Sequence, residues 1–181
     1  MSKMLSEMTL EELWQLFPII LTEHQGCWAD WFNEEKTFLS AILPLTKISH
    51  IGSTAVPGIW AKPTVDILME IGHDTDMHSL KNILADNGYS CMSEEESRMS
   101  FNKGYTENGF AERVFHLHLR YDGDNDELYF RDYLIAHPDV AKEYEKLKLG
   151  LWKQFEHDRD GYTERKTDFV KKYTKIAKEE L

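Results

Sequence analysis

Two short runs with strand character, separated by a loop of turn-forming residues, constrain the fold of this chain more than any other part of its sequence. The runs cover residues 47–51 and 64–71, and the loop between them carries Gly52 and the pair Pro57-Gly58. Glycine and proline at these positions predict a tight connection rather than a helix. The second run contains Asp66, a carboxylate that needs a partner or a ligand inside an apolar strand. The segment therefore predicts either a plain turn with one paired acid or a phosphate and metal site.

Capping signals and apolar periodicity predict helices on both sides of these strands. A capping box formed by Thr9 and Glu12 opens a helix that ends before Pro18. An aromatic stripe predicts a core-facing helix over 28–42, and Asp74 is expected to cap a further helix that ends at a glycine, residue 88. The remaining expected elements are strands over residues 19–22, 89–92, 98–103 and 113–121, and helices over residues 128–136, 138–155 and 162–180.

The order of these elements indicates the fold class. Mixed strands preceded by helices and followed by a helical tail are typical of an α+β fold. A length of 181 residues suits one domain. We expect residues 1–22 to form an N-terminal extension with a short helix and residues 23–181 to form the domain. Its sheet part extends to about residue 121, and its helical part begins at about residue 127.

The charge balance limits the partners of the chain. With 32 acidic and 21 basic residues the net charge is −11, so the chain repels nucleic acid at long range. A few lysines and arginines are still enough to form a pocket for a small phosphorylated ligand. No apolar run approaches the roughly 20 residues of a membrane helix, and the N-terminus lacks the apolar segment of a signal peptide. Since Cys27 and Cys91 match no metal or redox spacing, we expect a cytoplasmic protein without a membrane partner.

The loop after the first run has the residue types of a phosphate site. A glycine at a strand end lets backbone amides approach an anion closely, and Ser53 and Thr54 add hydroxyl donors after Gly52. Lys62 precedes the second strand and is a candidate to neutralise a phosphate. Arg131 is a second candidate, although Arg131 followed by an aspartate on a helix is better explained by an ion pair or a solvated face.

The carboxylates of the second run are candidates for a metal site. Asp66 and Glu70 share one face of the strand, but residues four apart are about 13 Å apart along it. One metal ion does not bridge that distance easily. Leu68 occupies the position from which a second carboxylate would reach the same ion. The pattern thus supports Asp66 as a ligand of Mg²⁺ or another divalent metal and gives weaker support to Glu70.

Histidines provide a second set of candidate ligands. His116 and His118 share one face of a predicted strand, and imidazoles at this spacing either bind a transition metal or pair with carboxylates. His50 is a further candidate, though a histidine at a strand end is often a core residue. A zinc site of these three histidines, with Glu70 as general base, would indicate a hydrolase and is the third hypothesis.

The sequence resembles the GrpB family, also called UPF0157. The resemblance is carried first by His-Ile-Gly-Ser-Thr-Ala-Val-Pro-Gly at residues 50–58, and it covers about residues 23–175. The further matching segments are Lys62-Pro63, Asp66-Ile-Leu68, residues 26–35, His116-Leu-His118, residues 130–138, the pattern Ala141, Tyr144, Leu147 and Lys148, and the pattern Tyr162, Thr163, Glu164 and Lys166.

This resemblance implies a nucleotidyltransferase-like mixed β-sheet with flanking helices and a C-terminal helical segment. In the nucleotidyltransferase superfamily a Gly-Ser loop holds the nucleotide phosphates, and two or three carboxylates hold Mg²⁺. Gly52, Ser53 and Asp66 match that loop and the first carboxylate, whereas Leu68 does not match the second. No acid in residues 114–119 matches the third. GrpB-like domains also occur fused behind dephospho-CoA kinase, which implies a small nucleotide or CoA-related ligand.

Two functions follow from these observations. The first is a nucleotidyltransferase in which the Gly52-Ser53 loop binds nucleotide phosphates, Asp66 holds the metal, and a nucleotidyl group passes to a small acceptor. The second is a non-catalytic module that keeps the phosphate loop but has lost the metal carboxylates, as Leu68 suggests. An Asp66 that faces an open cleft beside a second ligand favours the enzyme. An Asp66 sealed in an ion pair favours the module.

Overall fold

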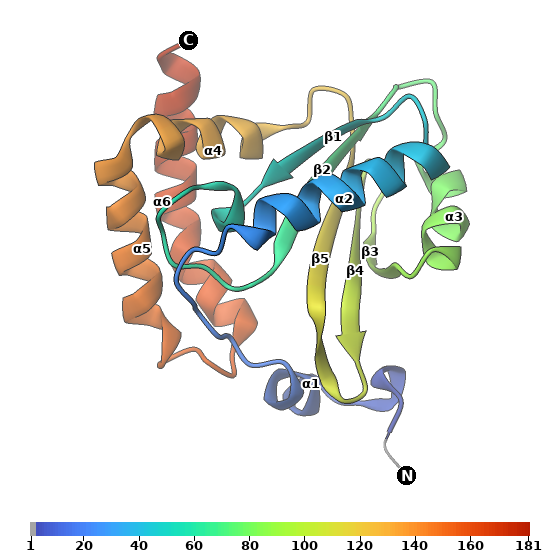
Figure 1. Ribbon diagram of the computed structural model, residues 1–181, viewed down its shortest axis with the longest axis horizontal. Coiled ribbons are helices and arrows are strands. Elements are labelled where there is room, and N and C mark those ends of the chain that lie inside the picture. Colours follow the sequence, from blue (N-terminus) through green and yellow to red (C-terminus); the bar gives the residue numbers. More distant parts are fainter. Residues whose placement is uncertain (1–2) are drawn as a thin grey trace.

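The computed structural model describes residues 3–181, which form a five-stranded mixed sheet with helices around it (Figure 1). The strand order is β1-β2-β5-β4-β3, and only the central pair β2 and β5 is parallel. The strands are β1 Lys47–Ile51, β2 Val65–Ile71, β3 Ser90–Glu94, β4 Arg98–Thr106 and β5 Gly109–Tyr121. This is the expected α+β class.

Helices surround the sheet unevenly. Figure 1 shows α2 lying across the sheet, α3 beside β3, and α4 to α6 gathered next to the β1 edge. The helices are α1 Leu10–Leu16, α2 Cys27–Ile42, α3 Lys81–Asp86, α4 Asp126–Ala136, α5 Pro138–Trp152 and α6 Arg159–Glu179, with 3₁₀ turns at Leu5–Glu7, Ser53–Ala55 and Met77–Leu80. Within residues 3–181 no helix has the length and apolar character needed to cross a membrane.

The main core lies between α2 and one face of the sheet. The aromatic stripe predicted over 28–42 does face this core, since Trp28 and Phe32 are buried there. Every second residue of the strands completes it, because side chains alternate between the two faces. The buried sheet residues include Ile48, Val65, Ile67, Met69, Ile71, Met99, Phe101, Phe115, Leu117 and Leu119. The opposite face of the sheet carries polar side chains, among them Asp66, His116 and His118, beside buried apolar residues such as Leu68.

The loop between β1 and β2 joins the sheet to the C-terminal helices. Val56 and Ile59 are buried against apolar side chains of α4 and α5. Glu145 of α5 accepts a hydrogen bond from the Trp60 amide at 2.9 Å, and Lys142 donates to the Gly58 carbonyl at 2.8 Å. The loop is therefore held against α4 and α5, while its tip at Pro57-Gly58 is exposed.

Two sequence predictions for local elements are wrong. The helix after β2 is capped by Asp76, whose carboxylate accepts from the His78 amide, and not by Asp74. Residues 19–22 form no strand, because only one bridge links Thr22 to Ala61. The capping box of Thr9 and its partner glutamate is confirmed, with both reciprocal hydrogen bonds present.

The buried face of β2 predicts a large stability difference between two isoleucine positions. Ile67 is fully buried in the main core, whereas Ile135 on α4 is 46% exposed. We expect Ile67→Ala to lower the free energy of unfolding by about 2–5 kcal/mol, because it leaves a cavity. We expect Ile135→Ala to cost less than about 1 kcal/mol. Denaturant unfolding measures both, and equal losses would contradict this placement of the core.

Candidate functional site

The carboxylate of Asp66 lies against the backbone of Gly52. A β-carbon added at Gly52 would lie 2.6 Å from Asp66 Oδ2, and Gly52 has φ +75°, a conformation that other residues adopt at a cost. Asp66 projects from β2 on the face away from the main core, and the neighbouring strand β1 ends at Ile51, one residue before Gly52. The position of the Asp66 carboxylate therefore requires a glycine at residue 52, and the Gly52-Ser53 loop and Asp66 form one site.

Two imidazoles from β5 contact the other oxygen of Asp66. His116 Nδ1 and His118 Nε2 lie 3.5 and 3.4 Å from Asp66 Oδ1, which is long for a hydrogen bond. The Asp66 side chain remains 27% exposed. Burial raises the pKa of this carboxyl, but the two imidazoles outweigh that effect and hold the pKa well below its usual range. Asp66 is therefore an ionised carboxylate that both contacts histidines and reaches solvent.

A chain of polar contacts extends from His116 to the start of α6. The Tyr105 hydroxyl accepts a hydrogen bond from Arg159 Nη1 at 2.7 Å and lies 2.6 Å from His116 Nε2. The hydroxyl therefore donates to Nε2, which assigns the ring proton to Nδ1 beside Asp66. Burial lowers the pKa of His116, so its imidazole is neutral.

The serine of the loop is bound by a lysine from α5. Lys148 Nζ donates to Ser53 Oγ at 2.8 Å and to the Trp60 carbonyl at 2.6 Å. Lys148 is only 2% exposed, and burial together with the nearby Lys62 lowers its pKa to about 7. Its ammonium also lies 4.8 Å from the centre of the Tyr144 ring, which offsets part of its desolvation.

Two further lysines lie beside Lys148. Lys62 and Lys166 are both partly buried and lie over the ring of Tyr162, at 5.7 and 4.4 Å from its centre. Burial and the charge of Arg159 lower the pKa of Lys62 to about 8. Burial and the two neighbouring lysines place the pKa of Lys166 well below its usual value. The three ammonium groups share one small region, because Lys62 and Lys166 lie over the same ring and Lys148 is bound to the Trp60 carbonyl, two residues before Lys62.

The cations of this region lack carboxylate partners. Within residues 3–181 no ion pair involves any of the four, which are Lys62, Lys148, Lys166 and Arg159. Burying charge without a partner is costly in the folded protein. In a chain with net charge −11, acids are abundant, so this arrangement is specific to the site.

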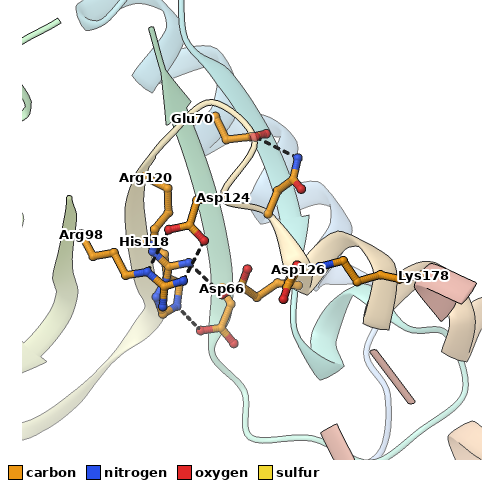
Figure 2. Close-up of polar contacts among 10 residues, drawn as sticks. Asp66, Glu70, Arg98, His118, Arg120, Asp124, Asp126 and Lys178 are labelled. Carbon is orange, nitrogen blue, oxygen red and sulfur yellow. Dashed lines mark hydrogen bonds and ion pairs between the residues drawn. The ribbon is translucent and has the colours of Figure 1, made fainter. Parts of the chain in front are cut away.

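The other end of the same sheet face gives a direct contrast (Figure 2). There Arg98 pairs with Asp124 at 2.7 Å, and Arg120 pairs with Glu127 at 2.8 Å. Lys47 at the edge of the sheet likewise pairs with an aspartate of the loop 122–127. Cations at that end are neutralised by the protein itself, whereas those near Asp66 are not.

Several residues predicted for the site lie elsewhere. Glu70 sits at the far end of β2, where its carboxylate accepts from the Gly123 amide and from Asn125 Nδ2 (Figure 2). Arg131 is bound to Asp132 and donates to the His50 carbonyl at 2.9 Å, so it holds α4 against β1 instead of facing the lysines.

His50 and its neighbour Thr54 are also turned away from Asp66. The His50 ring stacks on Phe32 of α2 at 4.8 Å, on the core side of the sheet. His50 Nε2 lies 2.9 Å from the Thr54 hydroxyl, so this hydroxyl already has a hydrogen-bond partner. Burial lowers the pKa of His50 to about 4, as expected for a neutral core histidine. Because His50 lies on the opposite face from His116 and His118, the zinc hypothesis is wrong.

The chain alone supplies few ligands for a metal ion. Within residues 3–181 no group of three His, Cys, Asp or Glu side chains is arranged to hold one. Leu68, at the position of a second carboxylate, is fully buried. Asp66 with an adjacent imidazole fits a divalent cation only if ligand phosphate oxygens and water supply the other positions, as Mg²⁺ sites commonly do.

The sequence from residue 18 to residue 176 matches the family model described as GrpB protein. The chain belongs to the GrpB family. It is 37% identical over 161 residues to the glutamate-rich protein GrpB of Alkalihalophilus pseudofirmus, covering 84% of this chain and 91% of that protein. It is 33% identical over 156 residues to the UPF0157 protein YqkA of Bacillus subtilis, covering 83% of this chain and 45% of that protein.

Solved structures agree with the family and with the fold. The conserved protein GrpB from Enterococcus faecalis superposes with a TM-score of 0.76 at 32% identity, over 87% of this GrpB chain and 96% of that chain. The Cid1 poly(U) polymerase superposes with a TM-score of 0.50 at 11% identity, over 70% of this chain and 42% of that chain. The fold of this GrpB protein is therefore nucleotidyltransferase-like.

Sequence reasoning missed three of the four unpaired cations. Lys148 and Lys166 each stand in a segment that resembles the family, but they were not singled out as phosphate ligands. Arg159 lies outside those segments, next to the helix cap Asp158. The available signal was that two matching helical segments both end on a lysine. Whether such a lysine faces the loop or solvent depends on how the helices pack.

The approach of Asp66 to Gly52 predicts a difference between two glycine substitutions. Gly58 has φ +79°, close to that of Gly52, but a β-carbon there would meet no atom within 4 Å. Both Gly→Ala variants carry backbone strain, and only Gly52→Ala adds the clash with Asp66. We expect Gly52→Ala to lower the free energy of unfolding by at least about 1 kcal/mol more than Gly58→Ala. Equal losses in denaturant unfolding would show that the carboxylate moves away freely.

Proposed function

We propose that this GrpB protein binds the polyphosphate of a nucleotide at the Gly52-Ser53 loop and transfers a nucleotidyl group to a small acceptor. The observation that carries the proposal is buried Lys148, bound to Ser53, together with half-buried Lys62 and Lys166, none of which forms an ion pair within the described part of the chain. A polyphosphate is the ligand class that neutralises several cations at once. The nucleotidyltransferase-like fold supports the same reading, since this loop follows β1 and Asp66 stands on the adjacent strand.

The residues of the site have distinct roles in this reaction. The acceptor attacks the α-phosphorus of the nucleotide, and pyrophosphate leaves. Lys62, Lys148 and Lys166 bind the β- and γ-phosphates and stabilise the charge that develops on the leaving pyrophosphate. Ser53 and the backbone at Gly52 orient these phosphates. Lys148, which donates to the Ser53 hydroxyl, would turn to the ligand and leave that hydroxyl free to contact a phosphate.

A divalent cation, Mg²⁺ or Mn²⁺, is part of this proposal. Asp66, with His118 or His116 beside it, would hold the ion together with phosphate oxygens. When bound, such an ion polarises the phosphoryl group and neutralises charge in the transition state. Neutral imidazole ligands suit Mn²⁺ better than Mg²⁺, which prefers oxygen.

A non-catalytic binding module is the second candidate function. The specific observation in its favour is Leu68, which is buried where a second metal carboxylate would stand. In this case the lysines bind a phosphorylated ligand, such as a nucleotide or CoA, and Asp66 serves to fix the loop through Gly52. The transferase depends on a divalent metal ion, whereas the binding module binds its ligand without one.

Thermal-shift titration tests phosphate binding. Purified protein is titrated with ATP, GTP, CTP, UTP and CoA, each with and without Mg²⁺ or Mn²⁺. A ligand that binds only the native state stabilises it by about 2.7 kcal/mol at a concentration of 100 Kd, so Tm rises. We expect Lys148→Gln to weaken this binding roughly tenfold or more. Lys47→Gln is the matched control, because Lys47 is exposed and paired with Asp122.

The outcomes separate the two functions. A metal-dependent shift that is lost in Asp66→Asn, with pyrophosphate release when acceptors are added, supports the transferase. A shift that is independent of metal and unchanged in Asp66→Asn supports the module. The proposal fails if no compound raises Tm at millimolar concentration, or if Lys148→Gln and Lys47→Gln bind nucleotide equally well.

The lowered pKa values of the lysines predict proton uptake on binding. Because the pKa of Lys148 is about 7 and that of Lys62 about 8, both are partly neutral at pH 8. A bound phosphate favours the charged forms and raises both pKa values, so protons are taken up. Affinity should therefore fall as the pH rises from about 7 to 9. Calorimetry at pH 8 in buffers of different ionisation enthalpy measures the uptake, which should be smaller in Lys148→Gln.

A further inference from the structure

A small cavity opens beside the lysine cluster formed by Lys62, Lys148 and Lys166, and Lys62 is part of its wall. Its volume is about 70 Å³, enough for a group of a few heavy atoms. The walls come from the segment before α2, the residues just before β2, the first half of β5 and the start of α6. The lining residues are Pro18, Ile20, Lys62, Pro63, Thr64, Phe110, Ala111, Glu112, Val114 and Arg159.

Two cations line this cavity, and neither has a carboxylate partner among residues 3–181. Arg159 uses Nη1 to donate to the Tyr105 hydroxyl, but its Nε is buried and has no hydrogen-bond partner. Lys62 makes no ion pair. Glu112 is the one acid in the lining, and its side chain is exposed. An unsatisfied guanidinium donor beside an ammonium group is a site for an anion.

The rest of the lining is apolar. Pro63, Phe110 and Val114 present carbon atoms to the cavity, and Pro18 closes it from the segment that leads to α2. An inorganic anion would leave these surfaces in contact with water, whereas an anion on a short hydrocarbon stem would cover them. The lining therefore fits a small organic molecule with one anionic end, either a carboxylate or a phosphate.

The cavity is connected to the candidate reaction site. Thr64 precedes β2, which carries Asp66, and Arg159 reaches Asp66 through the contacts of Tyr105 and His116. Lys62 belongs to both the cavity and the lysine cluster. A molecule anchored in the cavity would thus lie next to the phosphates bound at the Gly52-Ser53 loop.

We propose that this cavity is the acceptor subsite, in which Arg159 and Lys62 bind the anionic end of a small organic acid or phosphate ester. That the bound molecule is the acceptor rests on the proposed function, whereas the existence of an anion site rests on the cavity alone. Arg159 is a binding residue for the acceptor and makes no contact with the reacting phosphorus. The apolar walls select a short stem and exclude bulky acceptors.

Four probes with a short unbranched alkyl stem test the proposal: butyrate, n-butyl phosphate, butanol and butylamine. Binding to the full chain is measured by ligand-observed NMR and by thermal shift. We expect butyrate or n-butyl phosphate to bind at least roughly tenfold more tightly than butanol, because charge-assisted hydrogen bonds form to Arg159. The comparison of the two anions identifies the head group. Equal binding of butanol and both anions, or no binding of any probe, would overturn the proposal.

Two variants locate the binding. Val114→Phe fills the cavity, and Arg159→Gln removes the guanidinium; either should abolish binding of the anionic probe. Arg165→Gln on the same helix is the matched control, because Arg165 is exposed and outside the cavity. If Val114→Phe does not fold, Arg159→Gln alone decides. Retained binding in a folded Arg159→Gln variant would overturn the proposal.

The lysine variant separates this inference from the proposed function. Lys148→Gln should lose nucleotide binding and keep binding of the anionic probe, since Lys148 does not line the cavity. Val114→Phe should lose binding of the anionic probe and keep nucleotide binding. If nucleotide binding fails in the wild type while the probe binds at the cavity, the anion site stands and the transferase does not. If both ligands respond to the same variant, there is one site and the separate subsite is wrong.

Discussion

The site depends on the contact between the Asp66 carboxylate and the backbone of Gly52. This contact leaves no space for a β-carbon and fixes the direction in which the chain leaves β1. The loop that follows is then held by α5, through Glu145 and Lys142, and packs its apolar residues against the C-terminal helices. Lys148 comes from the same helix, so the packing that holds the loop also brings this lysine to Ser53. One close approach therefore links the sheet, the loop and the helical part.

The distribution of charge gives this arrangement its functional meaning. At one end of the polar sheet face, Arg98 pairs with Asp124 and Arg120 pairs with Glu127 at the start of α4. Near Asp66, buried Lys148 and half-buried Lys62 and Lys166 form no ion pair with any residue from 3 to 181. Both ends belong to one acidic chain, so the difference does not reflect a shortage of carboxylates. A protein keeps buried, unpaired cations at a cost in stability, and binding of an anionic ligand removes that cost.

Catalysis and phosphate binding depend on different residues of the proposed site. In the proposed function the lysines and Ser53 bind phosphate, whereas Asp66 and its two histidines hold the metal ion. The first carboxylate of the nucleotidyltransferase pattern is present, but buried Leu68 replaces the second. The imidazoles of His116 and His118 contact the remaining acid instead. Leu68 at this position leaves the proposed phosphate contacts unchanged, whereas the proposed metal ion would need phosphate oxygens of the ligand to complete its coordination.

The sequence by itself determined the elements of the fold, the family resemblance, the Gly52-Ser53 loop and the single acid Asp66. These features rest on local patterns: strand alternation, capping residues, and glycine where the backbone turns. Only the tertiary structure decided which charged side chains meet. It brought Lys148 and Lys166 to the loop, and it sent Glu70 and Arg131 to other partners. A lysine on a helix has the same local pattern whether it faces solvent or a buried site, so its role is set by how the helices pack.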